Sequence, residues 1–273
     1  MAGLRTRLLW GLGSRLSRRS ADRLARWLAP VLALLPLPAV RAWESTVRLA
    51  TGRRGRRRAL LEHWLRNALW SLSLPNWDAD ELRAVARIDD ADVAKLHASL
   101  AGPGLVLALP HMGSWDFAGA WCATQGIEVV SVAERLPDGL YERFRRARAE
   151  MGMRIHPIDR PQLVSVLAGE VRAGRMVCLL ADRVFGRHGV DVPWPGTDRT
   201  LRVPAGPAVV ARRTGADLRA VTIWFDGDHL VMTVSDVITG DTAEDLLAGC
   251  VETFADGVRR RPESWLMLRS VLR

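Results

Sequence analysis

Apolar positions along this chain follow two different periods. Through the first 100 residues they recur at helical spacing, most clearly over residues 59–70. From residue 104 onward short apolar runs alternate with amphipathic stretches, which is the pattern of strand followed by helix. Such alternation predicts an α/β fold, a mainly parallel sheet covered by helices. We expect the helices of residues 60–100 to pack onto or beside that sheet.

The expected strands are short, apolar and bounded by Gly, Pro or charged residues. We expect strands at residues 105–109, 127–133, 154–158, 176–180, 218–224 and 230–237. We expect helices at residues 114–125, 140–151, 161–173, 204–214 and 242–260. Gly and Pro residues at 186–196 indicate a loop. On the helix at 140–151 the charged side chains are expected in solvent, namely Glu142, Arg143, Arg145, Arg146 and Arg148.

Charge divides the chain into two regions. Residues 1–60 hold fourteen arginines against Asp22 and Glu44, and because the whole chain has a net charge of +9, residues 61–273 are net negative. A chain of 273 residues, 48% of them hydrophobic, can build one large core with a small appendage. We therefore expect basic amphipathic helices over residues 1–60 and one α/β domain over residues 61–273.

The longest apolar run of the basic region does not have the form of a membrane span. Residues 27–40 are short of the ~20 apolar residues that a spanning helix needs. Pro30, Pro36 and Pro38 interrupt the run, and it follows several arginines rather than a short basic leader. We therefore expect neither a transmembrane helix nor a secretory signal here.

Two sets of side chains in the basic region suit a membrane surface instead. The leucines at helical spacing are Leu4, Leu8, Leu12 and Leu16, and the tryptophans are Trp10, Trp27 and Trp43. Arginines lie between them, as in segments that rest on anionic lipid with indoles at headgroup level. The arginines of residues 53–58 would also attract nucleic-acid phosphates, but no recognisable nucleic-acid-binding motif accompanies them. We expect an anionic membrane surface as a partner and no nucleic acid, with a leucine stripe in the core as the alternative.

A polar pair interrupts the first apolar run of the α/β region. His111 follows the strand expected at residues 105–109, and Asp116 lies five positions later. Sites in open α/β sheets form at the carboxyl ends of strands, so His111 is expected at the mouth of one. With Ser114 as the helix N-cap, Asp116 lies in the first turn and can reach back to hold one imidazole nitrogen. The other nitrogen would then act as a general base.

No side chain near this pair has the pattern of a nucleophile. Residues 112–116 do not form a G-x-S-x-G elbow. Cys122, Cys178 and Cys250 are spaced too widely for a disulfide framework or a zinc site, so we expect no metal. The base would activate a hydroxyl of the substrate, without a covalent enzyme intermediate. The spacing alone leaves two alternatives open, a core histidine and a non-catalytic lipid- or nucleic-acid-binding module.

Several motifs together resemble the glycerolipid and lipid A type acyltransferases. His111 to Asp116 is similar to the HX4D motif of these enzymes, and the similarity extends through residues 181–183, 189–196, 202–211 and 260–265. The resemblance implies an acyltransferase domain over residues 61–273 that moves a long-chain, palmitoyl-type acyl group from acyl-CoA to a membrane glycolipid. The same motifs resemble members of this family that acylate a mannose hydroxyl of a phosphatidylinositol mannoside, which implies such an acceptor. It further implies a peripheral position at the cytoplasmic face of the cell membrane, and no cofactor beyond the acyl-CoA substrate.

The resemblance also assigns roles to individual residues. It makes His111 the base and Asp116 the carboxylate that orients it. Asp191 stands where the family usually has glutamate, so its role is open. The other residues expected to bind substrate are Glu134, Arg135, Asp182, Arg183, Arg199 and Arg202.

Acyl transfer requires three further features around such a base. Arg199 and Arg202 precede an expected helix start and would form a cradle for the donor's phosphates, with surface cations as the alternative. Backbone amides of Gly113 and Ser114 are candidates for an oxyanion hole. The aromatic candidates for an apolar acyl pocket are Trp115, Phe117, Trp121, Phe185 and Trp194.

Overall fold

The computed structural model describes residues 10–137, 139–185 and 189–273. At its centre is a seven-stranded sheet with the order β1-β9-β8-β2-β5-β3-β4. Its strands are β1 (Ala86–Arg87), β2 (Leu105–Leu109), β3 (Val129–Ala133), β4 (Met153–Pro157), β5 (Met176–Leu180), β8 (Asp217–Asp226) and β9 (His229–Val234). Neighbouring strands are parallel except β8 and β9, which form an antiparallel hairpin. The predicted mainly parallel α/β sheet is confirmed, and β2 and β5 have the predicted bounds.

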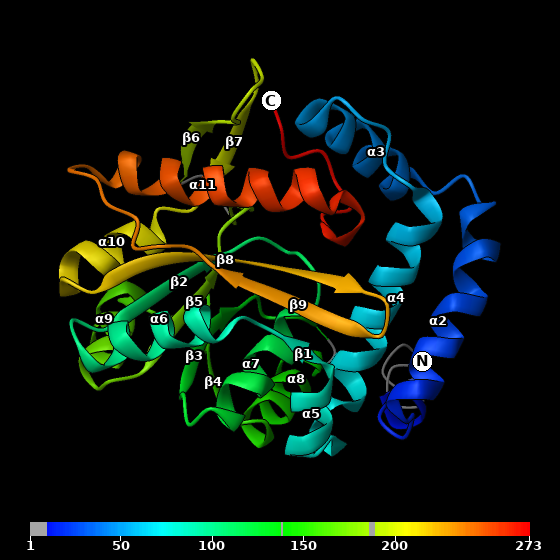
Figure 1. Cartoon of the computed structure of the whole chain (residues 1–273), viewed down its shortest axis with the longest axis horizontal. Coiled ribbons are helices and arrows are strands. Elements are labelled where there is room, and N and C mark those ends of the chain that lie inside the picture. The colour runs from blue at the N-terminus through cyan, green and yellow to red at the C-terminus, as the bar shows by residue number, and fades with distance from the viewer. Residues whose placement is uncertain (1–9, 138, 186–188) are drawn as a thin grey trace.

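Helices cover both faces of the sheet and one of its ends (Figure 1). One face carries α9 (Leu163–Arg172), α10 (Gly206–Thr214) and α11 (Ala243–Arg260). The other face carries α5 (Ala79–Val85), α6 (Asp90–Ala101), α7 (Trp115–Thr124) and α8 (Leu140–Glu150). At the end toward which β8 points stand α2 (Arg18–Ala33), α3 (Pro38–Thr51) and α4 (Arg57–Ser73). The short 3-10 helices are η1 (Leu74–Asn76) and η2 (Pro262–Ser264).

Strand β2, at the centre of the sheet, has an unbroken run of apolar residues in its sequence. Val106 and Ala108 belong to the core under α11, whereas Leu105, Leu107 and Leu109 belong to the core under α7. Because helices exclude water from both faces, all five residues are buried and none has to be polar. The strand therefore places His111, two residues beyond its last residue, at the carboxyl edge of the sheet.

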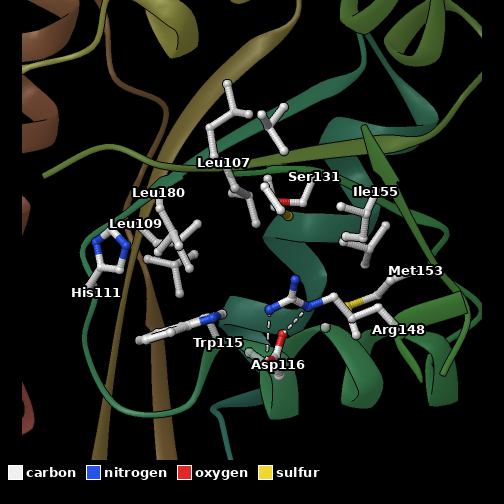
Figure 2. A pocket seen from close by; sticks show the side chains of 18 of the residues that line it. Leu107, Leu109, His111, Trp115, Asp116, Ser131, Arg148, Met153, Ile155 and Leu180 are labelled. Carbon is white, nitrogen blue, oxygen red and sulfur yellow. Dashed lines mark hydrogen bonds and ion pairs between the residues drawn. The ribbon is translucent and has the colours of Figure 1, made fainter. Parts of the chain in front are cut away.

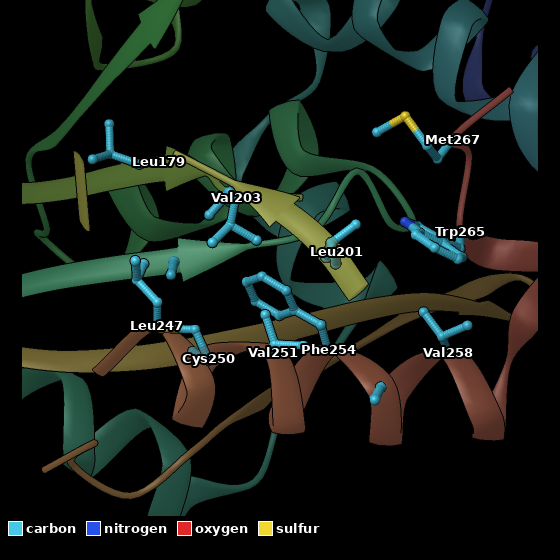
Figure 3. Packing of buried hydrophobic residues seen from close by; sticks show 14 of the residues in the cluster. Leu179, Leu201, Val203, Leu247, Cys250, Val251, Phe254, Val258, Trp265 and Met267 are labelled. Atoms are coloured by element: carbon cyan, nitrogen blue, oxygen red, sulfur yellow. The ribbon is translucent and has the colours of Figure 1, made fainter. Parts of the chain in front are cut away.

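The expected loop at residues 186–196 contains a strand. β6 (Val190–Pro193) pairs with β7 (Thr200–Val203) in an antiparallel hairpin that stands beyond α11 in Figure 1. Leu201 and Val203 of β7 pack against Phe254 of α11 (Figure 3). The loop prediction was therefore wrong at 190–193, because four residues ending in proline are too short to show strand periodicity. The two residues of β1 were missed in the same way, within a region expected to be helical.

The N-terminal helices are attached to the body by buried polar contacts. Trp43 of α3 is fully buried and donates a hydrogen bond of 2.7 Å to the carbonyl of Trp265. Asp22 of α2 and Arg66 of α4 form a buried ion pair at 3.0 Å, and Trp70 donates to the same carboxylate at 2.8 Å. The expectation that Trp43 lies at a membrane headgroup boundary was wrong, because its ring fills the core.

The predicted leucine stripe is only partly described. Leu4 and Leu8 lie outside the described residues, Leu12 is exposed, and Leu16 packs against the core. In the described ranges no single helix has the length and apolar composition to cross a membrane; α2 and α3 reach both only as a pair, and that pair is bent by 91°.

Candidate active site

A cavity of about 690 Å³ lies between the sheet and α7 and reaches His111 at the end of β2 (Figure 2). Its floor consists of strand residues, and α7 and α8 close the opposite side. Figure 2 labels ten of the residues that line the cavity: Leu107, Leu109, His111, Trp115, Asp116, Ser131, Arg148, Met153, Ile155 and Leu180. Most of these side chains are apolar, so the cavity suits a ligand with a long apolar part and one reactive end near the imidazole.

The carboxylate of Asp182 holds the imidazole of His111. His111 Nδ1 lies 2.5 Å from Asp182 Oδ1, and the backbone N–H of His111 donates to Asp182 Oδ2 at 2.8 Å. The indole N–H of Trp265 donates to the same Oδ2, also at 2.8 Å. Since a carboxylate only accepts hydrogen bonds, the proton of a neutral imidazole lies on Nδ1 and Nε2 keeps its lone pair. His111 therefore has the form of a general base at the rim of the cavity.

Asp182 remains ionised although it is almost completely buried. Burial opposes the charged form, but attraction to His111 and the hydrogen bonds from His111 and Trp265 outweigh it and lower the pKa of the Asp182 carboxyl. β2 and β5 are neighbouring parallel strands, so the residues that follow them meet at one edge of the sheet. This topology brings Asp182 to His111.

Asp116 does not orient His111, and this expectation was wrong. Its carboxylate accepts a forked pair of hydrogen bonds from Arg148, 2.7 Å from Nε and 3.2 Å from Nη2 (Figure 2). Asp116 lies in the first turn of α7 as predicted, but that turn faces α8 across the cavity. Arg148 was expected in solvent with its neighbours on α8; instead it is largely buried, and the attraction of Asp116 outweighs the burial and raises its pKa.

Glu134 and Arg183 lie at the cavity as predicted. Both line it, and Arg183 Nη2 lies 3.7 Å from Glu134 Oε2. The guanidinium of Arg183 also lies 4.2 Å from the ring centre of Phe185. Arg135 is placed differently, because it pairs with Asp159 at 2.9 Å and does not line the described part of the cavity. Glu134 and Arg183 therefore offer one acidic and one basic group to a ligand at the rim of the cavity.

The predicted oxyanion donors are not both available. The N–H of Gly113 already donates to the carbonyl of Ser264 at 2.8 Å, so that assignment was wrong. Gly113 has φ +63°, and a Cβ there would lie 2.8 Å from the carbonyl oxygen of Ile223, so the turn requires glycine. Ser114 occupies the N-cap position of α7, but its side chain makes no capping hydrogen bond.

Three of the five aromatic candidates line the cavity, namely Trp115, Trp121 and Phe185. Phe117 does not, because it is fully buried against Trp70 and Trp77. Trp194 does not either, because its ring stacks on Trp265 and its N–H donates to the carbonyl of Ala50 at 2.9 Å. For these two residues the pocket assignment was wrong, since both serve the core.

The predicted phosphate cradle is not part of this cavity. Arg202 pairs with Asp191 at 2.9 Å across the β6–β7 hairpin. Arg199 borders a separate shallow hollow together with Arg48 and Arg259. None of the three predicted residues, Asp191, Arg199 and Arg202, lines the cavity of His111 in the described ranges.

The thiols in the cavity are not poised as nucleophiles. Cys122 and Cys178 both line it. Burial raises the pKa of Cys122 to about 12 and raises that of Cys178 as well, so both thiols stay protonated at neutral pH. In the part of the chain that the structure describes, no group of three His, Cys, Asp or Glu side chains could hold a metal ion.

Comparison with known proteins identifies the family of this chain. The family model of the bacterial lipid A biosynthesis acyltransferases matches residues 67–273, and the chain belongs to that family. It is therefore an acyltransferase. The phosphatidylinositol mannoside acyltransferase of Mycolicibacterium smegmatis is 37% identical over 220 residues, which are 78% of this chain and 70% of the relative. The protein of the same name from Mycobacterium tuberculosis H37Rv is 37% identical over 194 residues, 68% of this chain and 59% of the relative.

Proposed function

We propose that this acyltransferase moves a palmitoyl-type acyl group from acyl-CoA to a mannose hydroxyl of a phosphatidylinositol mannoside. The observation that carries the proposal is a mostly apolar cavity of about 690 Å³ whose lining includes a histidine held by a carboxylate. The cavity suits the acyl chain, and the imidazole suits deprotonation of an alcohol. The acceptor is proposed because the two relatives described above are phosphatidylinositol mannoside acyltransferases.

In the proposed reaction His111 acts first as a base and then as an acid. Nε2 takes the proton of the mannose hydroxyl while that oxygen attacks the thioester carbonyl carbon. The resulting imidazolium is stabilised by Asp182 at Nδ1. The carbon–sulfur bond then breaks, the acyl group stays on the sugar oxygen, and the CoA sulfur leaves with the proton from Nε2. This step needs no metal or cofactor, because the thioester already supplies an activated acyl group.

Glu134 and Arg183 are proposed to bind the acceptor. They lie at the rim of the same cavity with opposite charges. A carboxylate accepts hydrogen bonds from sugar hydroxyls, and a guanidinium pairs with a phosphate, so together they match a phosphorylated glycolipid. The acyl chain would then occupy the apolar part of the cavity under α7.

We also propose that the enzyme rests peripherally on the anionic cytoplasmic face of the cell membrane, through the outer ridge of α2. This ridge consists of large apolar side chains of α2 and of the two residues that follow it, with exposed fractions of 38–84%: Leu24, Trp27, Leu28, Val31, Leu34 and Leu35. Exposed Arg19 and Arg23 lie on the same helix. A basic helix with an apolar outer face is typical of segments that lie in the headgroup region.

The test is the release of free thiol from palmitoyl-CoA, with and without a phosphatidylinositol mannoside, by wild type and His111→Ala. We expect release that the acceptor stimulates and that falls by at least about 10³-fold in the variant. Acceptor-independent release would support the donor and refute the acceptor, leaving another glycolipid or a lysophospholipid. No release by the wild type would refute the acyl-CoA donor.

A further inference from the structure

Trp265 makes the one hydrogen bond to Asp182 in the described structure that does not come from His111. Its indole N–H donates to Oδ2 at 2.8 Å, and the ring is fully buried. The other donors to Asp182 are the ring and the backbone N–H of His111. A carboxylate held only by the group that it orients would rotate together with that group. Trp265 therefore anchors Asp182 to a different part of the chain.

The backbone around Trp265 is joined to the loop that carries the base. Trp265 and Met112 form an isolated antiparallel bridge. The N–H of Leu266 donates to the carbonyl of His111 at 2.7 Å, and the N–H of Gly113 donates to the carbonyl of Ser264 at 2.8 Å. The segment 264–266 thus holds the loop on both sides of Met112, while its indole holds the orienting carboxylate.

Trp265 is in turn held by the N-terminal helices and by the β6–β7 hairpin. Trp43 of α3 donates to its carbonyl oxygen at 2.7 Å. Trp194 stacks on its ring with a centroid distance of 5.5 Å and an angle of 11°. Figure 3 shows the ring of Trp265 among the buried hydrophobic residues that pack against α11. The first contact holds the backbone of Trp265 and the second packs against its ring, whose N–H is directed at Asp182.

We infer that Trp265 is a positioning residue for the general base, and that α3 supports it through Trp43. The inference rests on the proposed role of His111. It assigns to the N-terminal helices a part in orienting the base, in addition to the membrane contact proposed for them. A residue with this role changes the rate of the chemical step but not the binding of either substrate.

The first test compares Trp265→Phe with Trp70→Phe. Both indoles are fully buried and donate to a buried aspartate at 2.8 Å, but the partner of Trp70 is Asp22, outside the cavity. Trp265→Phe is expected to lower kcat about 10- to 100-fold with KM values within twofold of wild type. Trp70→Phe is expected to lose comparable thermal stability and to keep kcat. Equal losses of kcat in the two variants, or wild-type kcat in Trp265→Phe, would overturn the inference.

The second test does not depend on the substrate. ¹⁵N spectra of the histidines, with His111 assigned from its loss in His111→Ala, report which ring nitrogen carries the proton. We expect the Nδ1–H form in wild type and Trp70→Phe, and a mixture of forms in Trp265→Phe. If Trp265→Phe fails to fold, benzothienylalanine at position 265 keeps the ring shape and removes only the N–H. A wild-type spectrum in the variant that folds refutes the role of Trp265, whereas absent acyl transfer by wild type refutes only the proposed function.

Discussion

Asp116 and Asp182 are both buried carboxylates near His111, and their partners separate their roles. Asp182 contacts the imidazole, whereas Asp116 contacts Arg148. In Asp182→Asn the amide can keep its oxygen at the Oδ2 position and place its NH₂ against His111 Nδ1. That nitrogen must then accept, so the imidazole proton moves to Nε2 and the base is lost. We predict a fall in kcat of about 10³- to 10⁴-fold with little change in KM, measured by acyl transfer.

Asp116→Asn serves as the comparison for this prediction. It leaves the guanidinium of Arg148 buried with only a neutral partner, so stability is expected to fall by about 3 kcal/mol or more. The tautomer of His111 should stay unchanged in its ¹⁵N spectrum. If the tautomer of His111 changed in Asp116→Asn and not in Asp182→Asn, Asp116 rather than Asp182 would be the carboxylate that orients the base.

At the scale of the element, one side of α2 is buried against the protein, and the other side is apolar and exposed to solvent. Ala21, Ala25 and Ala29 are fully buried, whereas Trp27 on the helix and Leu34 at its C-cap are 80% and 84% exposed. Burying a large apolar side chain in a membrane interface contributes about 1.5–3 kcal/mol. We predict that Trp27→Ser with Leu34→Ser weakens sedimentation with anionic vesicles at least about tenfold, while acyl transfer to detergent-dispersed acceptor is retained.

Trp64→Ser is the matched control for the α2 ridge. Trp64 is also an exposed indole, 39% exposed, but it lies on α4. Its loss should leave vesicle binding within twofold of wild type. Equal weakening by Trp64→Ser would mean that exposed indoles in general, rather than the ridge of α2, hold the protein on the vesicle.

At the scale of the whole molecule, His63 connects α4 to the C-terminal segment and makes stability depend on pH. Its Nδ1 lies 3.1 Å from Ser264 Oγ, within hydrogen-bond distance. Burial first, and then the charge of Arg66, lowers the pKa of His63 to about 4. In the unfolded chain the pKa is about 6.5, so between pH 6.5 and pH 4 the unfolded state binds more protons and stability falls as the pH falls.

We predict that this group alone removes up to about 3 kcal/mol of stability between pH 6.5 and pH 4. Denaturant unfolding of wild type and His63→Gln across this range measures it. The glutamine can still form a hydrogen bond with Ser264 but does not titrate, so its curve should be flatter than that of wild type. Parallel curves for the two proteins would show that other groups cause the loss.

Local sequence determined the elements and their order. The apolar runs of β2 and β5 have the predicted bounds because strands buried on both faces need apolar residues at every position. The sequence also placed His111 just beyond β2, since it lies between the end of the strand at Leu109 and the start of α7 at Trp115. It could not show β6, because that strand depends on pairing with β7 rather than on a periodicity of its own.

Tertiary structure decided which side chains meet. Asp182 lies 71 positions from His111, and the order of strands in the sheet, not their spacing in sequence, brings the two together. Arg148 has charged neighbours like any solvated helix face, and only the position of α8 opposite Asp116 buries it. Helical and strand periods follow from contacts within a few residues, so a sequence displays them. Contacts between distant segments follow from how the elements pack, and these contacts select the partner of the base.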